Sequence, residues 1–331
     1  MKRNLRGLIA LALPAFFACG GGNDNLPPPP PPPGPPPATA MTPPLSPPSV
    51  EDAAPPPAPP APAITLLPGA ASADPPQPLP VVKLTAPTKD QVVAADKVNE
   101  FAVKLDVKNW QTATGSSHIH LILDNRPYKP IYDTKASVKL SELTAGAALD
   151  EGQHVLVAFA SRASHESVKT KDAITVVPFF VGKKGDAKVD VKKPLFIFSR
   201  PKGDYPGDMA NHVLVDFQLL NDTLAEGKDH VHFTVTGPGI EGSVSADVTK
   251  FGTPYYLDNL QDGAYAVKGE LLGGDNQPIP GPWSSAVRTI NVDHKAPTPA
   301  MPAMVMGAPD AGAPKAVPPA PKLAPKPTPK P

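Results

Sequence analysis

Short apolar runs that alternate with polar residues, at regular spacing, are the feature that most constrains the fold of this chain. Six such runs occur between Val81 and Val181, bounded by turns rich in Gly, Asn, Asp and Lys. They are VVKLTAP, EFAVKLDV, SHIHLILD, ASVKLSEL, QHVLVAFAS and AITVVPFFV. No 3.6-residue periodicity competes with them. Six or seven short strands in about 100 residues are typical of an antiparallel β-sandwich.

The span from Pro194 to Val292 repeats this plan. SHIHLIL at Ser117 aligns with DHVHFTV at Asp229, and LDEGQHVLVAF aligns with LQDGAYAVKGE. Repetition of one unit indicates a duplicated domain. The sequence therefore predicts an all-β protein with two tandem antiparallel β-sandwiches, at residues 81–183 and 194–294.

Proline marks the limits of the folded region. Half of the 50 prolines lie between residues 26 and 80, and twelve more lie between 295 and 331. Such segments bury no core, so we expect a disordered Pro-rich linker over 19–80 and a disordered Pro/Ala/Lys-rich tail over 295–331. The linker fits a passive spacer, and it also fits a docking site for a proline-recognising partner.

The first 19 residues have the pattern of a targeting signal. Three basic residues precede an apolar run at 7–18, which is too short to span a bilayer, and Cys19, the only cysteine, follows at once. The segment resembles a bacterial lipoprotein signal, although Phe16 stands where such signals prefer Leu. The resemblance implies removal of residues 1–18 and lipidation of Cys19, for example with palmitate. By the same resemblance, Gly20 after the cysteine favours the outer membrane.

The second copy contains a recognisable corner. Its pattern L-x-x-G-x-Y-x-V, with the tyrosine at Tyr265, resembles the tyrosine corner of immunoglobulin and fibronectin type III domains. In the first copy His154 occupies the position of Tyr265, so we expect a structural corner residue there and not a ligand.

The motifs HIHLILDNRPY, SRASHES and SRPKGDY lie within residues 81–292. Together they make this span resemble bacterial envelope lipoproteins with tandem immunoglobulin-like domains. The resemblance implies two immunoglobulin-like sandwiches and an envelope location, and it implies no activity.

The histidines of the first copy allow two interpretations. Side chains of a strand alternate between faces, which puts His118 and His120 together on the outer face of the predicted sheet. Immunoglobulin topology would bring the loop residues His165 and Glu166 to the same end of the sandwich. The four residues form either a polar outer face or a site for Zn²⁺ or Cu²⁺.

An apolar strip is expected on the same outer face. If His154 points inward, then Val155, Val157 and Phe159 point outward. Such a strip is a candidate docking surface. We expect the second domain to cover at least part of it.

The sequence contains no motif of a known catalytic or nucleotide-binding site. Its 31 basic and 31 acidic residues also give no nucleic-acid footprint. We therefore expect a non-enzymatic envelope lipoprotein without a cofactor, which acts as a binding or structural module. Its partners would be the membrane, through the lipid, and a cell-envelope polymer or protein. The alternative is a periplasmic or surface Zn- or Cu-binding protein that uses the histidine cluster.

The lipid anchor is tested by replacing Cys19 with serine. Serine has no thiol to acylate, so Cys19→Ser should move the protein from the membrane fraction to the soluble fraction and abolish labelling with a fatty acid analogue. Membrane association of Cys19→Ser at the wild-type level would refute the anchor.

Overall fold

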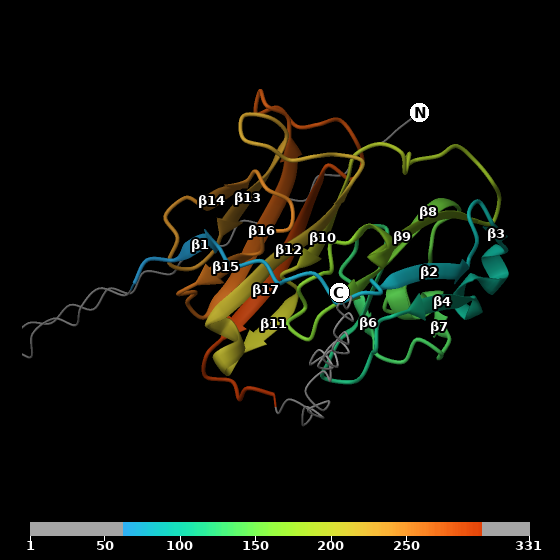
Figure 1. Ribbon diagram of the computed structural model, residues 1–331, viewed down its shortest axis with the longest axis horizontal. Coiled ribbons are helices and arrows are strands. Elements are labelled where there is room, and N and C mark those ends of the chain that lie inside the picture. The colour runs from blue at the N-terminus through green and yellow to red at the C-terminus, as the bar shows by residue number, and fades with distance from the viewer. Residues whose placement is uncertain (1–61, 300–331) are drawn as a thin grey trace, which may run out of the picture. The chain divides into compact units, whose positions relative to one another are not determined.

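The computed structural model describes residues 62–299, and there the fold is all-β: two immunoglobulin-like antiparallel sandwiches (Figure 1). Four short 3-10 helices join the strands in this range: η1 (Ala95–Glu100), η2 (Leu140–Leu143), η3 (Lys171–Ala173) and η4 (Gly207–Ala210). None of these helices is long and apolar enough to cross a membrane. The predicted signal, Cys19, most of the linker and nearly all of the tail lie outside the described residues.

The first sandwich pairs a three-stranded sheet with a five-stranded sheet. The smaller sheet has the order β2 (Val81–Ala86), β4 (Ala102–Lys108), β7 (Val138–Lys139). The larger has the order β3 (Val92–Val93), β9 (Ile174–Val181), β8 (Gly152–Ser161), β5 (His118–Leu123), β6 (Lys129–Ile131). Strands β5, β8 and β9 correspond to C, F and G of an immunoglobulin domain.

The second sandwich repeats this arrangement. One sheet has the order β1 (Thr65–Pro68), β15 (Tyr255–Asp258), β12 (His212–Leu220), β10 (Leu195–Arg200). The other has the order β11 (Gly203–Pro206), β17 (Ser285–Asp293), β16 (Gly263–Leu272), β13 (His230–Thr236), β14 (Val244–Val248). In both sandwiches a short strand, β3 or β11, pairs in parallel with the last strand.

Strand β1 corrects the predicted linker. We expected disorder up to Pro80, but Thr65–Pro68 pairs antiparallel with β15 and lies among the strands of the second sandwich (Figure 1). Ile64 and Leu66 are buried in the core of that sandwich. The run AITLL, which proline does not interrupt, was the signal for this strand. A strand of the second sandwich thus precedes the first sandwich in the sequence.

The tyrosine corner of the second sandwich and the turn after β5 follow from local chemistry. The hydroxyl of Tyr265 donates to the carbonyl of Pro238 at 2.8 Å and accepts from the backbone N–H of Gln261 at 2.8 Å, which is the geometry of a tyrosine corner. After β5, Asp124 and Asn125 have φ values of 51° and 53°. Two successive positive φ values are typical of a type I′ hairpin turn, and Asp and Asn tolerate them.

The outer face of the five-stranded sheet of the first sandwich packs against the second sandwich. Val155, Val157 and Phe159 are buried, and they belong to one apolar cluster with Ile122, Tyr128, Leu195, Ile197 and Trp283. The last three residues come from the second sandwich. The strip is therefore an interdomain contact and not an open docking surface.

Polar contacts complete this interface. The side chain of Asn125 donates to the carbonyl of Phe196 at 2.9 Å and accepts from the N–H of Phe198 at 3.1 Å. Its amide group thus makes the two hydrogen bonds to β10 that the backbone of a neighbouring strand would make. Arg288 donates to the carbonyls of Asn125 and Phe198 at 2.8 and 2.6 Å. Burial lowers the pKa of Arg288 to about 10. Both domains thus satisfy polar groups of the other.

The contribution of β1 to the second sandwich is tested by two adjacent leucines. Leu66 is 5 % exposed and Leu67 is 55 % exposed. Leu66→Ala should lower the free energy of unfolding by about 2–5 kcal/mol, because it empties a core position, and Leu67→Ala by less than about 0.5 kcal/mol. Denaturant unfolding of the whole chain measures both. Equal effects of the two substitutions would contradict the assignment of β1 to the core.

Candidate metal centre

Three histidines of the first sandwich lie close together on the face that packs against the second sandwich. His118 and His120 come from β5, and His165 comes from the loop between β8 and β9. The Nε2 atom of His118 lies 3.0 Å from Nε2 of His120 and 3.0 Å from Nδ1 of His165. One ligand atom from each ring lies within 4.8 Å of the others, and no other group of three His, Cys, Asp or Glu between residues 62 and 299 meets this condition. The predicted cluster therefore forms around its three histidines.

The sheet position of His118 and His120 agrees with the alternation of β5, but their environment does not. We expected a solvated outer face, whereas the two side chains are 1 % and 0 % exposed. The second sandwich covers this face, so its histidines are removed from water. Because a buried polar group needs a partner, the three rings satisfy one another and their immediate neighbours.

Hydrogen bonding fixes the orientation of the central ring. Nδ1 of His118 lies 2.8 Å from the carbonyl oxygen of Ser116, which only accepts, so this nitrogen carries the proton. Nε2 of His118 is then an acceptor that faces the other two rings. A ring N–H donated to a backbone carbonyl, with the opposite nitrogen free, is the usual arrangement of a metal-binding histidine.

The spacing of the three nitrogens suits one small cation. A metal ion with bonds of about 2.0–2.1 Å to nitrogen separates its ligand atoms by roughly 3.3–3.6 Å in tetrahedral or trigonal geometry. The two contacts of 3.0 Å need to open by only a few tenths of an ångström. The ligand atoms of His120 and His165 lie within 4.8 Å of each other and need to reach the same separation. An ion at the centre would engage one lone pair from each ring.

The backbone at His165 adds a second observation. Its φ is 67°, in the left-handed region that favours glycine and asparagine. A residue held there costs of order 1 kcal/mol or more, and such residues concentrate at ligand-binding positions. The conformation turns the side chain of His165 toward His118.

Burial and nearby positive charge keep the three rings neutral. Burial lowers the pKa of His118, and it holds the pKa of His120 well below its usual range with help from the neighbouring histidines. Burial, with Arg200 and His118, lowers the pKa of His165 to about 3. Neutral imidazole is the form that binds metal ions, so no proton needs to leave near pH 7.

Tyr128 and two cations surround the cluster. The ring of Tyr128 stacks on His120 with centroids 3.5 Å apart, and its hydroxyl lies 3.2 Å from Nδ1 of His165. The side chain of Lys202 donates to the carbonyl of Tyr128 at 2.8 Å. The guanidinium of Arg200 lies 5.3 Å from the centroid of the Tyr128 ring. Burial raises the pKa of Tyr128.

These neighbours were not predicted as site residues. Tyr128 lies in HIHLILDNRPY, five residues beyond β5, and Arg200 and Lys202 lie in SRPKGDY of the second copy. Neither motif has a chemical signature by itself. Only the docking of the second sandwich brings them to the histidines.

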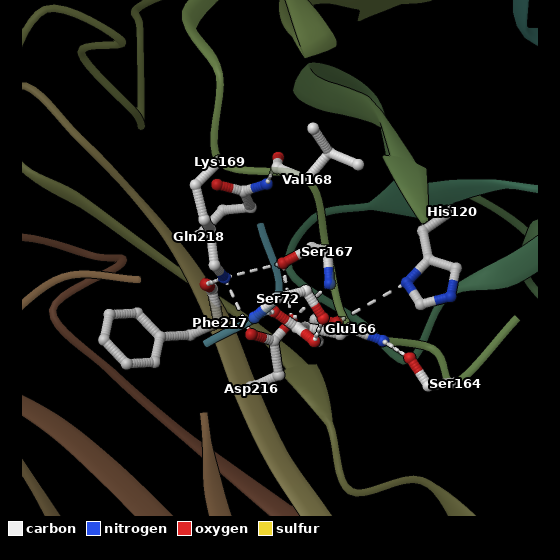
Figure 2. Close-up of polar contacts among 11 residues, drawn as sticks. Ser72, His120, Ser164, Glu166, Ser167, Val168, Lys169, Asp216, Phe217 and Gln218 are labelled. Atoms are coloured by element: carbon white, nitrogen blue, oxygen red, sulfur yellow. Dashed lines mark hydrogen bonds and ion pairs between the residues drawn. The ribbon is translucent and has the colours of Figure 1, made fainter. Parts of the chain in front are cut away.

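The structure does not bring Glu166 into the cluster. Its carboxylate accepts hydrogen bonds from the backbone N–H of Ser72, at 3.1 Å, and from the hydroxyl of Ser72. His165 contacts His118 of β5, whereas the next residue, Glu166, contacts Ser72 in the segment that follows β1. Figure 2 shows Glu166 beside Ser72, apart from the ring of His120.

The same loop joins the second sandwich through a buried ion pair. Asp216 of β12 accepts from the hydroxyl of Ser167 at 2.5 Å and from Lys169 at 2.7 Å (Figure 2). The side chain of Gln218 donates to the carbonyl of Val168 at 2.8 Å. Although Ser167 and Lys169 lie 2.7 Å apart, the ammonium is paired with a carboxylate, so it has no lone pair to activate the serine. The arrangement supports docking and not nucleophilic catalysis.

His154 and Tyr265 occupy equivalent corners. Nε2 of His154 lies 2.8 Å from the carbonyl of Asp150, four residues upstream, as the Tyr265 hydroxyl lies 3.1 Å from the carbonyl of Gln261. Nδ1 of His154 lies 2.7 Å from the carboxylate of Asp124. Burial alone would lower the pKa of His154, but the hydrogen bonds to Asp124 and Asp150 together raise it. His154 lies outside the metal cluster.

The second copy uses its histidines differently. His232 lies 2.6 Å from the carboxylate of Asp247 on the neighbouring strand, and His230 lies 3.0 Å from the carbonyl of Lys228. No histidine of the second copy corresponds to His165. The three-histidine arrangement is therefore specific to the first sandwich.

No protein-family model and no curated protein matches this chain. Among solved structures, the chain is similar to fibronectin(III)-like modules of Clostridium thermocellum CbhA, with 15 % identity, a TM-score of 0.22, and coverage of 64 % of this chain and 94 % of that one. It is also similar to the FN1–FN3 domains of chicken CNTN1, with 11 % identity, a TM-score of 0.21, and coverage of 66 % and 67 %. The Ig1–2 module of the Drosophila receptor protein tyrosine phosphatase DLAR has 11 % identity, a TM-score of 0.18, and coverage of 64 % and 98 %.

The neutral cluster predicts an acid-sensitive fold. In metal-free protein His165 stays neutral down to about pH 3, whereas a histidine of the unfolded chain takes a proton below about pH 6.5. Because the unfolded state binds more protons, stability must fall as the pH falls from about 6.5 toward 3.

His165→Asn removes this titrating group, and asparagine tolerates the left-handed backbone conformation of residue 165. Between pH 6 and 4 its stability should therefore fall less steeply than that of the wild type, by at most about 1.4 kcal/mol per pH unit. Urea unfolding at several pH values, with a chelator present, measures both slopes. Equal slopes would show that His165 is protonated in the folded state.

Proposed function

We propose that this protein is a non-catalytic metal-binding module that holds one transition-metal ion at His118, His120 and His165. The single observation that carries the proposal is the convergence of three neutral imidazole nitrogens, with contacts of 3.0 Å from His118 to each of the others. Three imidazoles suit zinc and copper. Zn²⁺ and Cu²⁺ are therefore the first ions to test.

The surroundings favour binding over catalysis. Tyr128 stacks on His120, and Ser199 lies 3.5 Å from Nδ1 of the same ring. Three protein ligands leave the fourth position of a tetrahedral ion free, but these packed side chains restrict the access of a substrate to it. Both His120 and Tyr128 are almost fully buried. A centre closed in this way suits storage, transfer or structural stabilisation.

The location follows from the sequence and forms part of the proposal. The lipoprotein-like signal and Cys19 would attach the chain to a bacterial envelope, most consistently to the outer membrane. Two or three acyl chains on one residue give stable anchoring. The Pro-rich linker would hold the two sandwiches away from the lipid surface.

A structural display module is the second candidate. The observation that favours it is the apolar contact between the sandwiches, with Val157 and Phe159 on one side and Ile197 and Trp283 on the other. A pair of domains joined by a buried interface presents its outer surfaces in a fixed relation, which suits recognition of a cell-envelope polymer or protein. This candidate does not require a metal ion.

Metal titration separates the two candidates. Isothermal titration of purified, chelator-treated protein with Zn²⁺ and Cu²⁺ should give one site per chain. Loss of a partner behind a metal ligand typically weakens binding 10–100-fold, so His118→Gln and His120→Gln, which remove ligands, should weaken it by about 100-fold or more.

Two matched variants serve as controls. Glu166→Gln and His154→Gln should bind like the wild type, because both side chains lie outside the cluster. Absence of binding by the wild type to Zn²⁺, to Cu²⁺ and to Cu⁺ under reducing conditions would refute the metal proposal and leave the display module. Loss of binding in Glu166→Gln, with His120→Gln unaffected, would refute the assigned ligands.

A further inference from the structure

The charge around the three histidines is unusual for a metal centre. Within residues 62–299 the cluster contains no Asp or Glu. Arg200 donates to the hydroxyl of Tyr205 and Lys202 donates to the carbonyl of Tyr128, and neither of these acceptors carries a negative charge. The ammonium of Lys202 lies 4.5 Å from the centroid of the Tyr128 ring, which in turn stacks on His120 at 3.5 Å. Both cations thus contact the ring that stacks on His120. A cation bound at the centre would be repelled by them.

Arg200 and Lys202 hold these positions because the fold fixes them. Arg200 is 8 % exposed and donates to the hydroxyl of Tyr205 at 3.1 Å. Lys202 donates to the carbonyl of Tyr128, and burial, with Arg200 and Lys129, lowers the pKa of Lys202. Neither side chain is free to swing into solvent without breaking these contacts. The positive charges of Arg200 and Lys202 are therefore held beside the histidine cluster by the fold.

Electrostatic repulsion discriminates between ions by their charge. The interaction of two charges is proportional to their product, so a divalent ion is repelled twice as strongly as a monovalent ion at the same place. Burial strengthens the effect, because water is absent from the space between the charges. A centre with three neutral ligands and two nearby cations thus disfavours the higher charge.

The three histidine ligands also favour a monovalent ion over a divalent ion. Cu²⁺ favours square-planar or tetragonal sites of nitrogen and oxygen ligands, whereas this cluster offers three nitrogens and no carboxylate. Three neutral nitrogens suit a monovalent d¹⁰ ion, which has no geometric preference from its d-electrons.

We propose that the centre holds copper and prefers Cu⁺ to Cu²⁺, because Arg200 and Lys202 place uncompensated positive charge beside three neutral imidazoles. This inference rests on the proposed metal-binding function and adds the oxidation state of the ion. The exchange between the two states is one electron, supplied in the experiment below by an external redox mediator.

The reduction potential of the copper-loaded protein tests this inference. Spectroelectrochemical titration of the full chain should give a potential above that of a copper–imidazole complex in the same buffer. A tenfold preference for Cu⁺ corresponds to 59 mV for a one-electron couple. Lys202→Met removes one charge and should shift the ratio of the Cu⁺ and Cu²⁺ dissociation constants toward Cu²⁺ by about tenfold, which lowers the potential by about 59 mV.

Two lysine variants complete the design. Lys202→Arg keeps the charge and should keep the wild-type potential. Lys129→Met removes a lysine that pairs with Glu142 at 3.3 Å, and it should shift the dissociation constants by less than about twofold, because this charge is already compensated. Both variants also show whether a change at Lys202 reflects misfolding.

The outcomes separate the inference from the proposed function. Copper binding with a potential at or below the copper–imidazole value, or with no response to Lys202→Met, would overturn the preference for Cu⁺ and leave the metal site standing. Absence of copper binding in both oxidation states would overturn the proposed function, and the inference with it.

Discussion

The packing of the second sandwich onto one face of the first is the contact on which the rest of the structure depends. Val155, Val157 and Phe159 would form an exposed apolar strip on an isolated first domain, and Leu195, Ile197 and Trp283 remove them from water. Burial of a Val or Phe side chain contributes about 1.5–3 kcal/mol. The same contact covers His118 and His120, so the packing that joins the two domains also removes these histidines from water.

Removal from water changes the chemistry of the histidine cluster. On an open sheet the imidazoles would titrate near their usual range, whereas burial lowers the pKa of all three. The loop that carries His165 also carries Ser167 and Lys169, which bind Asp216 of the second sandwich. The position of His165 and the docking of the domains are thus fixed by one short segment, and any ion held by the cluster would stabilise that segment.

Much of this organisation could be predicted from residues that act locally. The alternation in HIHLIL identifies the face of β5 that carries the histidines, and immunoglobulin topology places the loop of His165 near them. What could not be predicted depends on contacts between distant parts of the chain. Nothing in AITLLP indicates that it pairs with Tyr255–Asp258, almost 200 residues away, and SRPK gives no sign that Arg200 and Lys202 will lie beside Tyr128.

X-ray absorption of the copper-loaded protein tests the central claim most directly, because it reports the atoms bound to the ion without a crystal. The structure predicts three imidazole nitrogens at about 2.0 Å, as for nitrogen ligands of similar ions, with multiple-scattering features from the rings and no carboxylate. His120→Gln should leave two imidazoles or no bound ion. A spectrum without the multiple-scattering features of imidazole, or one unchanged in His120→Gln, would contradict a centre built from His118, His120 and His165.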